Sequence, residues 1–339
     1  MLNKLRTWTL ESASLLLLVS VGMAGCGTDA DLQPTDADDA LGAQPAPVSA
    51  QVADGTCSAG SSKSTFASYT NIPGYQRLTK PPTTGPYEPT LEVNAGYAEW
   101  TIYRPKDLGD TKHPVVIWGN GGCLKNGTLM GQFPLELASH GMVVLVDGKV
   151  FPATADPIAG GIRDFGGGGA GPMLATLDWL TIENERACSP LYHKLDLTKV
   201  GVSGQSCGGM MALPAAGDKR VTTALINNSG LFQRDAKVYA ALHTPIAFLI
   251  GGPSDMAYKN AEADIKAINT VPIFYANNPV NGHQATWDKV NAGEFGRVGL
   301  GWMKWQLLGD AASAKMFVGA DCELCKAGSK WTVKKKNMD

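Results

Sequence analysis

The chain has 339 residues, of which 44% are hydrophobic and 18% charged, so it can build the core of one large domain or of two small ones. Its formal net charge is only −2. This charge excludes a strongly basic surface and argues against nucleic acid or an anionic membrane surface as a partner.

The first residues have the pattern of an export signal. Lys4 and Arg6 precede an apolar run at residues 15–21, which is too short to remain in a bilayer as a spanning helix. Small residues before Cys26 resemble the lipobox of bacterial lipoproteins. We therefore expect residues 1–25 to be a lipoprotein signal peptide and Cys26 to carry the lipid, which would be the only contact with a membrane. The alternative is an ordinary secretory peptide, and either reading predicts an exported protein, in the cell envelope or secreted.

Residues 26–63 are rich in Asp, Ala, Pro and Thr and hold almost no large apolar side chains. Such a segment cannot bury enough apolar surface to fold. We expect it to be a flexible tether that leads to a folded domain at residues 64–339.

Short apolar runs alternate with amphipathic segments along that domain. Runs without polar alternation indicate strands covered on both faces, as in a parallel sheet. The pattern predicts a single α/β domain with a doubly wound, mostly parallel sheet. We expect strands at residues 98–103, 113–118, 142–147, 199–203, 221–226, 246–250 and 272–275, the last being the final strand, and helices at residues 133–140, 173–185 and 295–308.

A G-x-S-x-G motif, residues 204–208, stands between a predicted strand and a predicted helix. This context is typical of a nucleophile elbow, in which small residues allow a sharp turn that exposes the serine hydroxyl. Ser206 is the candidate nucleophile. The alternative is a glycine-rich turn without chemistry, and a cysteine nucleophile does not fit because Cys207 lies beside position 206.

A serine nucleophile needs a base and an acid, which follow it in the order acid, then histidine. His283 lies in the loop after the final predicted strand, and the other histidines occupy positions typical of structural roles. Asp255 follows the strand at 246–250 and would emerge at the same sheet edge. Its alternative role is a helix cap. The remaining acids between serine and histidine are expected at the solvated surface: Asp218, Asp235, Glu262 and Asp264.

Backbone donors for an oxyanion should flank the nucleophile. Cys207 supplies one N–H by its position after Ser206. The second should come from the loop after the strand at 113–118, where Asn120, Gly121 and Gly122 are equal candidates. The alternative is a plain glycine turn.

The order of these elements and motifs resembles the α/β-hydrolase superfamily over residues 65–319. Residues 251–257, residues 302–305 and the Gly309-Asp310 pair further resemble secreted dienelactone-hydrolase-like esterases, the group that includes bacterial cutinases and polyester hydrolases. In that group an aromatic residue commonly follows the glycine of the oxyanion loop, and a tryptophan follows the strand after the elbow helix. Here Asn120 and residues 227–230 stand at those places, which puts an aromatic clamp for a polymer ring in doubt.

Six cysteines remain besides Cys26, an even number that favours disulfides in an exported chain. Cys123 and Cys207 lie on the two loops that must meet at an oxyanion hole, so we expect them to pair. Cys322 and Cys325 lack further metal ligands nearby and are expected to form a local bridge rather than a zinc site. The lysines at 334–336 are expected in a solvated tail.

The sequence thus predicts a serine esterase, monomeric and without cofactor or metal, that forms an acyl-enzyme on Ser206 with His283 as base and Asp255 as orienting acid. The ester can be a polyester, a lipid, a carbohydrate ester or a phenolic ester, because a triad reports mechanism and not substrate. An entrance lined by asparagines would favour small or sugar-borne esters. The alternatives are a catalytically silent, surface-anchored binding protein on the same fold and a serine peptidase of that fold.

Overall fold

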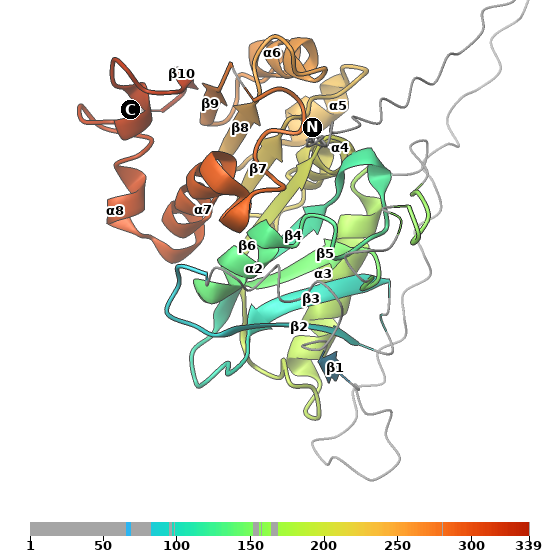
Figure 1. Ribbon diagram of the computed structural model, residues 1–339. Coiled ribbons are helices and arrows are strands. Elements are labelled where there is room, and N and C mark those ends of the chain that lie inside the picture. Colours follow the sequence, from blue (N-terminus) through green and yellow to red (C-terminus); the bar gives the residue numbers. More distant parts are fainter. Residues whose placement is uncertain are drawn as a thin grey trace, which may run out of the picture. The chain divides into compact units, whose positions relative to one another are not determined.

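A ten-stranded sheet in the order β1-β2-β3-β5-β4-β6-β7-β8-β9-β10 forms the centre of the structure (Figure 1). The structure, a computed structural model, describes the backbone of residues 66–68 and residues 83–94, 97, 99–151, 156, 158–163, 169–279 and 281–338. The predicted signal peptide, Cys26, the tether and the expected start of the domain lie outside these residues, so the structure leaves them as predictions.

Six adjacent strands, from β5 to β9, run parallel, with antiparallel strands on either side of them. The strands of this parallel set are buried along their whole length, with the exception of the 11-residue β6, whose first half is more exposed. The strands are β1 (Phe66–Ser68), β2 (Pro89–Asn94), β3 (Trp100–Pro105), β4 (His113–Gly119), β5 (Val143–Asp147), β6 (Leu195–Gln205), β7 (Thr223–Asn227), β8 (Ile246–Ile250), β9 (Ile273–Asn277) and β10 (Thr332–Lys336).

Helices cover both faces of the sheet and create two apolar cores. In β4, Val115 and Ile117 face the core under α3 (Gly171–Glu185) and α4 (Cys207–Ala215). Val116 and Trp118 face the opposite core under α2 (Gln132–Ser139) and α7 (Gly293–Leu308). Burial on both faces explains why these strands lack polar alternation, and the single, mostly parallel α/β domain is confirmed.

Of the remaining helical segments, α5 (Ala236–Ala241) and α6 (Tyr258–Ala267) contribute side chains to the core under α3 and α4. The others are η2 (Gly121–Cys123), η3 (Val290–Ala292), α8 (Ala311–Ala314) and η4 (Glu323–Cys325). None of the helices within the described ranges combines the length and hydropathy of a membrane span.

The expectation for the lysines at 334–336 was wrong, and so was the expectation that the strand at 272–275 is the last. These lysines belong to β10, which pairs antiparallel with β9. Lys334 forms an ion pair with Glu262, and the Lys336 ammonium donates to the backbone carbonyls of Ile265 and Ile268 at the end of α6. Lysines are common on an edge strand because charge opposes pairing with a further chain.

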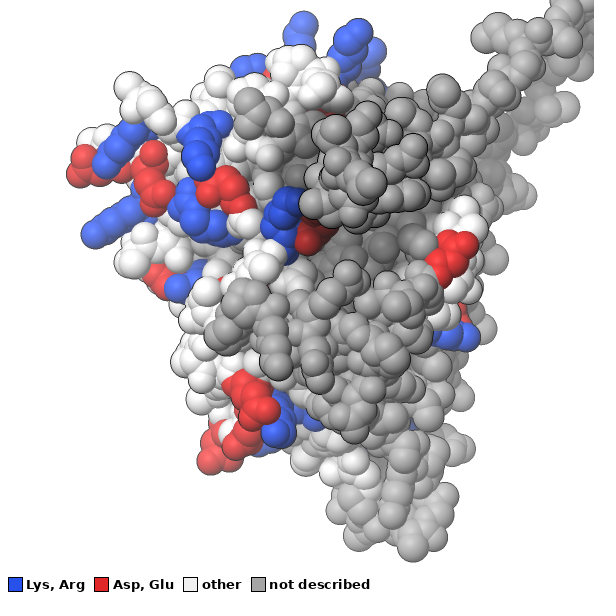
Figure 2. Space-filling view, viewed as in Figure 1, with Lys and Arg blue, Asp and Glu red and all other residues white. Residues whose placement is uncertain are grey.

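Charged side chains of both signs are interspersed on the visible face. Figure 2 shows Lys and Arg beside Asp and Glu over the C-terminal elements, where Arg297 pairs with Glu294 and with Glu323. This pairing leaves the described part of that face without a large patch of one sign.

Candidate active site

The G-x-S-x-G motif forms a strained turn between β6 and α4. Ser206 has φ 54° and ψ −115°, a backbone conformation that residues other than glycine rarely adopt. A Cβ at Gly204 would lie 2.3 Å from the backbone of Gly208, and a Cβ at Gly208 would lie 1.9 Å from the carbonyl oxygen of Gly119. A side chain at either position would clash with the backbone, so both positions of the motif require glycine, as is typical of a nucleophile elbow.

His283 lies in the loop after β9 and connects Ser206 to Asp255. Its Nε2 is 2.9 Å from the Ser206 hydroxyl oxygen, and its Nδ1 is 2.6 Å from Asp255 Oδ1. The Asp255 side chain is completely buried, whereas the His283 side chain is 20% exposed. This geometry lets a neutral imidazole accept the serine proton while the buried carboxylate faces the resulting positive charge.

The Asp255 carboxylate accepts hydrogen bonds from four donors. Besides His283, these are the backbone N–H groups of Gly251 and Ala257 and the side-chain amide of Asn228. Burial alone would raise the pKa of this carboxyl, but these hydrogen bonds hold its pKa below the usual value, so it stays ionised. The bond from Ala257 closes the turn before α6, but Asp255 is not the cap of that helix, whose N-cap residue is Ala257 and has no side-chain cap.

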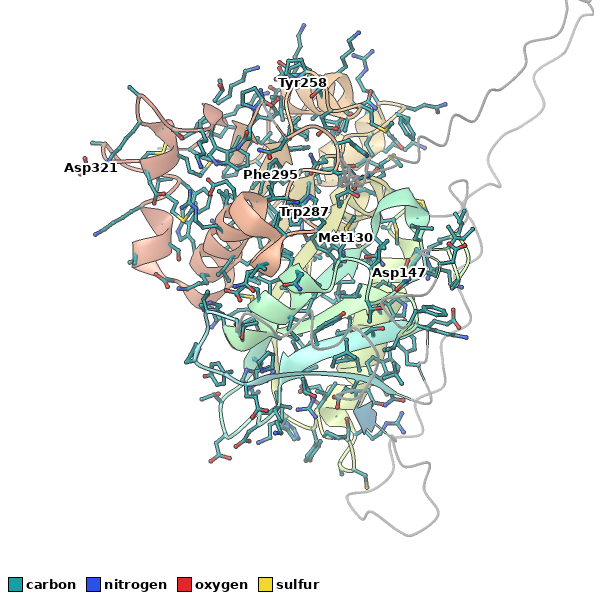
Figure 3. All side chains as sticks on the ribbon, in the orientation of Figure 1. Met130, Asp147, Tyr258, Trp287, Phe295 and Asp321 are labelled. Carbon is teal, nitrogen blue, oxygen red and sulfur yellow. A yellow bond between two sulfur atoms is a disulfide. The ribbon has the colours of Figure 1, made fainter. Side chains whose placement is uncertain are left out.

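Three residues that the sequence reasoning missed hold the acid and the base in place. Asn228 donates from Nδ2 to Asp255 Oδ2 at 2.7 Å and to the Gly282 carbonyl at 3.2 Å, and its Oδ1 accepts from Trp287 Nε1 at 2.9 Å. Gln205 Nε2 donates to the His283 carbonyl at 3.0 Å. Figure 3 shows Trp287 between Phe295 and Met130. The only sequence signals were the place of Gln205 inside the motif and of Asn228 directly after β7.

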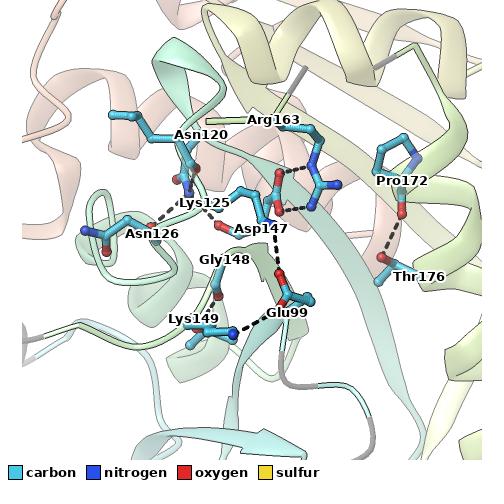
Figure 4. A network of polar contacts seen from close by, with 12 residues as sticks. Glu99, Asn120, Lys125, Asn126, Asp147, Gly148, Lys149, Arg163, Pro172 and Thr176 are labelled. Atoms are coloured by element: carbon cyan, nitrogen blue, oxygen red, sulfur yellow. Dashed lines mark hydrogen bonds and ion pairs between the residues drawn. The ribbon is translucent and has the colours of Figure 1, made fainter. Parts of the chain in front are cut away.

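Asn120, a candidate for the second oxyanion donor, has its side chain turned into the protein. Its Nδ2 donates to the backbone carbonyls of Asn126 and Asp147 at 2.9 and 2.7 Å (Figure 4). It also donates to the Leu124 carbonyl at 3.1 Å, and its Oδ1 accepts from Trp118 Nε1. Because Asn120 is only 1% exposed and Asn228 is fully buried, the expected asparagine-lined entrance was wrong. Both amides satisfy internal partners instead.

A salt bridge supports the same loop from its other side. Arg163 donates from Nε and from one terminal nitrogen to the Asp147 carboxylate, at 2.8 and 2.5 Å (Figure 4). The Arg163 backbone N–H also donates to the Cys123 carbonyl at 2.7 Å. The loop after β4 is therefore anchored to the end of β5 and to the segment that follows β5.

The loop after β4 meets the elbow at two points. The Gly208 N–H donates to the Asn120 carbonyl at 3.1 Å, and Cys123 forms a disulfide with Cys207. The backbone N–H groups of Cys207, Asn120, Gly121 and Gly122 donate no hydrogen bond to another described residue. One donor beside Ser206 and a choice of three across from it are therefore free for an oxyanion.

Cys322 and Cys325 form a second disulfide, and Cys188 is disulfide-bonded as well. Within the described ranges, no group of three or more His, Cys, Asp or Glu side chains has the arrangement of a metal site.

One acid that was expected at the surface is buried. Asp264 of α6 is 0% exposed and accepts hydrogen bonds from the Leu231 N–H and the Tyr239 hydroxyl at 2.8 and 2.6 Å. Burial raises the pKa of Asp264 to about 6. This carboxyl fastens the loop after β7 to α6, a tertiary contact that the sequence pattern did not indicate.

Exposed apolar side chains, rather than amides, occur on the loops that leave the carboxyl ends of the parallel strands. We call this set the apolar rim: Leu129, Ile158, Ile162, Phe232, Met256 and Val290. Phe232 and Met256 are the most exposed, at 74% and 75%. Met256 directly follows Asp255, which places an apolar side chain next to the acid of the site.

Comparison with known families identifies the chain's relatives. The sequence pattern of the PET hydrolase-like family matches residues 73–333, a range that contains Ser206, Asp255 and His283. A comparison with curated proteins gives no match. The family match supports a carboxylic ester hydrolase in general terms. The chain belongs to the PET hydrolase-like family, with its α/β-hydrolase fold.

Proposed function

We propose that the protein hydrolyses carboxylic esters through an acyl-enzyme on Ser206, with His283 as general base and acid and Asp255 as the group that orients His283. The observation that carries the proposal is the continuous relay from the Ser206 hydroxyl to His283 at 2.9 Å and from His283 to Asp255 at 2.6 Å. No other histidine in the described residues bridges a serine hydroxyl and a carboxylate in the same way.

The reaction divides into acylation and deacylation. Ser206 attacks the ester carbonyl while His283 takes its proton, and the tetrahedral oxyanion accepts hydrogen bonds from the Cys207 N–H and from an N–H of residues 120–122. His283 then gives the proton to the departing alkoxide, which leaves as the alcohol. Water, deprotonated by His283, attacks the acyl group, and the proton returns to Ser206 as the carboxylic acid leaves.

We further propose that the substrate is an ester with apolar groups on at least one side of the scissile bond. The apolar rim supports this choice, because covering the exposed side chains of Phe232 and Met256 with an apolar group of the substrate makes the free energy of binding more favourable. The inward orientation of Asn120 and Asn228 removes the reason to favour sugar-borne esters. Aromatic polyesters, which the family's description names, fall within this class.

The disulfides and the family support an extracellular place of action, since disulfides persist in oxidising compartments. Export by the N-terminal signal and lipid attachment at Cys26 are part of the same proposal. Mass spectrometry of the mature N-terminal peptide tests them, because a diacylglyceryl modification on Cys26 is expected and cleavage elsewhere without lipid would contradict it.

A fluorophosphonate probe tests the proposed chemistry. We expect covalent labelling of the wild type and none of Ser206→Ala, with labelling of His283→Ala at least a hundredfold slower. Ser254→Ala is the matched control, because Ser254 is an exposed serine beside Asp255 that takes no part in the relay, and it should label like the wild type. An unlabelled wild type would favour a catalytically silent binding protein, and equal labelling of Ser206→Ala would remove Ser206 from the mechanism.

The substrate class is tested separately with p-nitrophenyl esters of increasing acyl length. We expect kcat/KM to rise from the acetate to medium-chain esters, and Met256→Ser to reduce this gain without changing the rate on the acetate. A rate that falls steadily with chain length would contradict an apolar substrate while leaving the serine mechanism intact.

A further inference from the structure

The disulfide Cys123–Cys207 joins the residue after the nucleophile to the loop that faces it. Cys207 carries the N–H that is free for an oxyanion, and Cys123 ends the short helical turn that begins with the candidate donors Gly121 and Gly122. The two cysteines are 84 residues apart in the chain, and both are only 3% exposed. The bridge therefore connects the two sides of the oxyanion hole covalently.

The backbone at this bridge has a conformation that needs support. Gly122 and Cys123 have φ 63° and φ 54°, two consecutive left-handed residues. Glycine adopts this conformation freely, whereas a residue with a Cβ does so at a cost in free energy that the surrounding structure must offset. Cys123 is thus held in a strained conformation directly beside the free N–H groups.

Close packing of Gly119 on Gly208 and of Gly121 on the Gln205 side chain also holds this loop against the elbow. The buried Asn120 amide fixes where the loop begins, and the Arg163 N–H holds the Cys123 carbonyl. Across the gap to the elbow, the described residues show one backbone hydrogen bond, from Gly208 to Asn120, besides the disulfide. For Cys123 itself, the disulfide is the covalent connection to α4.

We infer that the Cys123–Cys207 disulfide positions the oxyanion donors of residues 120–122 against that of Cys207, so that its loss lowers kcat and leaves substrate binding nearly unchanged. This inference rests on the proposed function. The donors act on the charge that develops in the transition state, so their displacement affects kcat more than KM. The cysteines are positioning residues, because the proposed contact with substrate is through the backbone and not through sulfur.

The variant Cys123→Ala/Cys207→Ala removes the bridge and keeps every backbone N–H. Loss of a single oxyanion donor lowers kcat by about 10²–10³-fold, and displacement of one that remains nearby should cost about tenfold to a hundredfold. Cys322→Ala/Cys325→Ala is the matched control, because that bridge joins two residues of one local turn and involves neither the elbow nor the loop after β4. We expect the control pair to keep the wild-type kcat.

The deciding measurement is the inhibition constant of an alkyl trifluoromethyl ketone, which adds the Ser206 oxygen to its carbonyl and so places an oxyanion in the hole. In the variant without the bridge, this inhibition constant should rise by the same factor by which kcat on a p-nitrophenyl ester falls, while KM changes less than about threefold. A purely structural role would lower the amount of folded enzyme, seen by active-site titration with the fluorophosphonate, without weakening the inhibitor. That result, or a kcat equal to that of the control pair, would overturn the inference.

A second variant covers a failure to fold. Cys123→Gly/Cys207→Ala also lacks the bridge, but glycine adopts a positive φ without strain, and the same criteria apply to it. Failure of the proposed function is recognised separately, because the wild type would then neither label at Ser206 nor hydrolyse the ester.

Discussion

Asn228→Ala removes the side chain that links the acid, the histidine loop and a buried indole. In the folded protein its amide donates to the ionised Asp255 and accepts from Trp287 Nε1, which is 2% exposed. A hydrogen bond to a charged group contributes about 1.5–3 kcal/mol, and a buried donor left without a partner costs about 1–3 kcal/mol. We expect the free energy of unfolding to fall by about 3–5 kcal/mol.

Activity should fall less than it would without Asp255. The carboxylate keeps its hydrogen bonds to Gly251, Ala257 and His283, so its orientation is only partly released. We expect kcat to decrease about tenfold, which corresponds to about 1.4 kcal/mol in the activation free energy. Urea unfolding and ester hydrolysis measure the two effects on the same preparation.

A double-mutant cycle with Trp287→Phe tests the reasoning. Phenylalanine keeps the ring packing against Trp118 and Phe295 and removes only the indole N–H. In the Asn228→Ala background the donor has already lost its partner, so Trp287→Phe should cost less there than in the wild type, with a coupling of about 1 kcal/mol or more. Strictly additive stability losses would refute the account of this hydrogen-bond network.

Three further predictions concern stability. The pKa of Asp264 is about 6 in the folded protein and near 3.8 in the unfolded chain, so between these pH values the folded state binds more protons than the unfolded state. The free energy of unfolding should therefore fall by up to about 3 kcal/mol as the pH rises from 4 to 6. Urea unfolding of Asp264→Asn at several pH values should lack this decrease. Equal slopes would contradict the assignment. Gly208→Ala, whose Cβ would lie 1.9 Å from the Gly119 oxygen, should destabilise the protein by about 3 kcal/mol and abolish labelling of Ser206. Gly171→Ala, with open space around its Cβ, should lower the melting temperature by no more than about a degree or two. Similar melting temperatures for both variants would refute the steric argument. Lys336→Ala should cost about 1 kcal/mol because its ammonium binds the last carbonyls of α6, with exposed Lys335→Ala near zero, and chemical denaturation of the pair decides whether that contact matters.

The central strands could be predicted because burial on both faces gives β4, β5, β7 and β8 continuous apolar runs. β10 could not, because an edge strand with three lysines has no apolar run and acquires its conformation from pairing with β9. β2, whose alternating residues precede the first strand that we expected, was missed as well.

At the site, the chain order and the ends of parallel strands were enough to indicate Ser206, Asp255 and His283 as neighbours. The directions of side chains were not predictable in the same way. The sequence predicts Asn120 and Asn228 as polar entrance residues, yet both side chains turn inward. Asn120 donates to backbone carbonyls of its own loop and of Asp147, and Asn228 binds the Asp255 carboxylate and the Trp287 indole N–H. The orientation of a buried amide is set by its hydrogen-bond partners, and some of those partners come from distant parts of the chain.

The antiparallel pairing of β10 with β9 imposes an order on assembly. β9 ends at Asn277, and β10 begins only at Thr332, after the His283 loop, α7 and α8. While the chain emerges from its N-terminus, β9 is complete before the strand that covers its outer edge exists. An uncovered edge of this kind is a template for other strands, so partly made chains are exposed to association at β9 until β10 closes it.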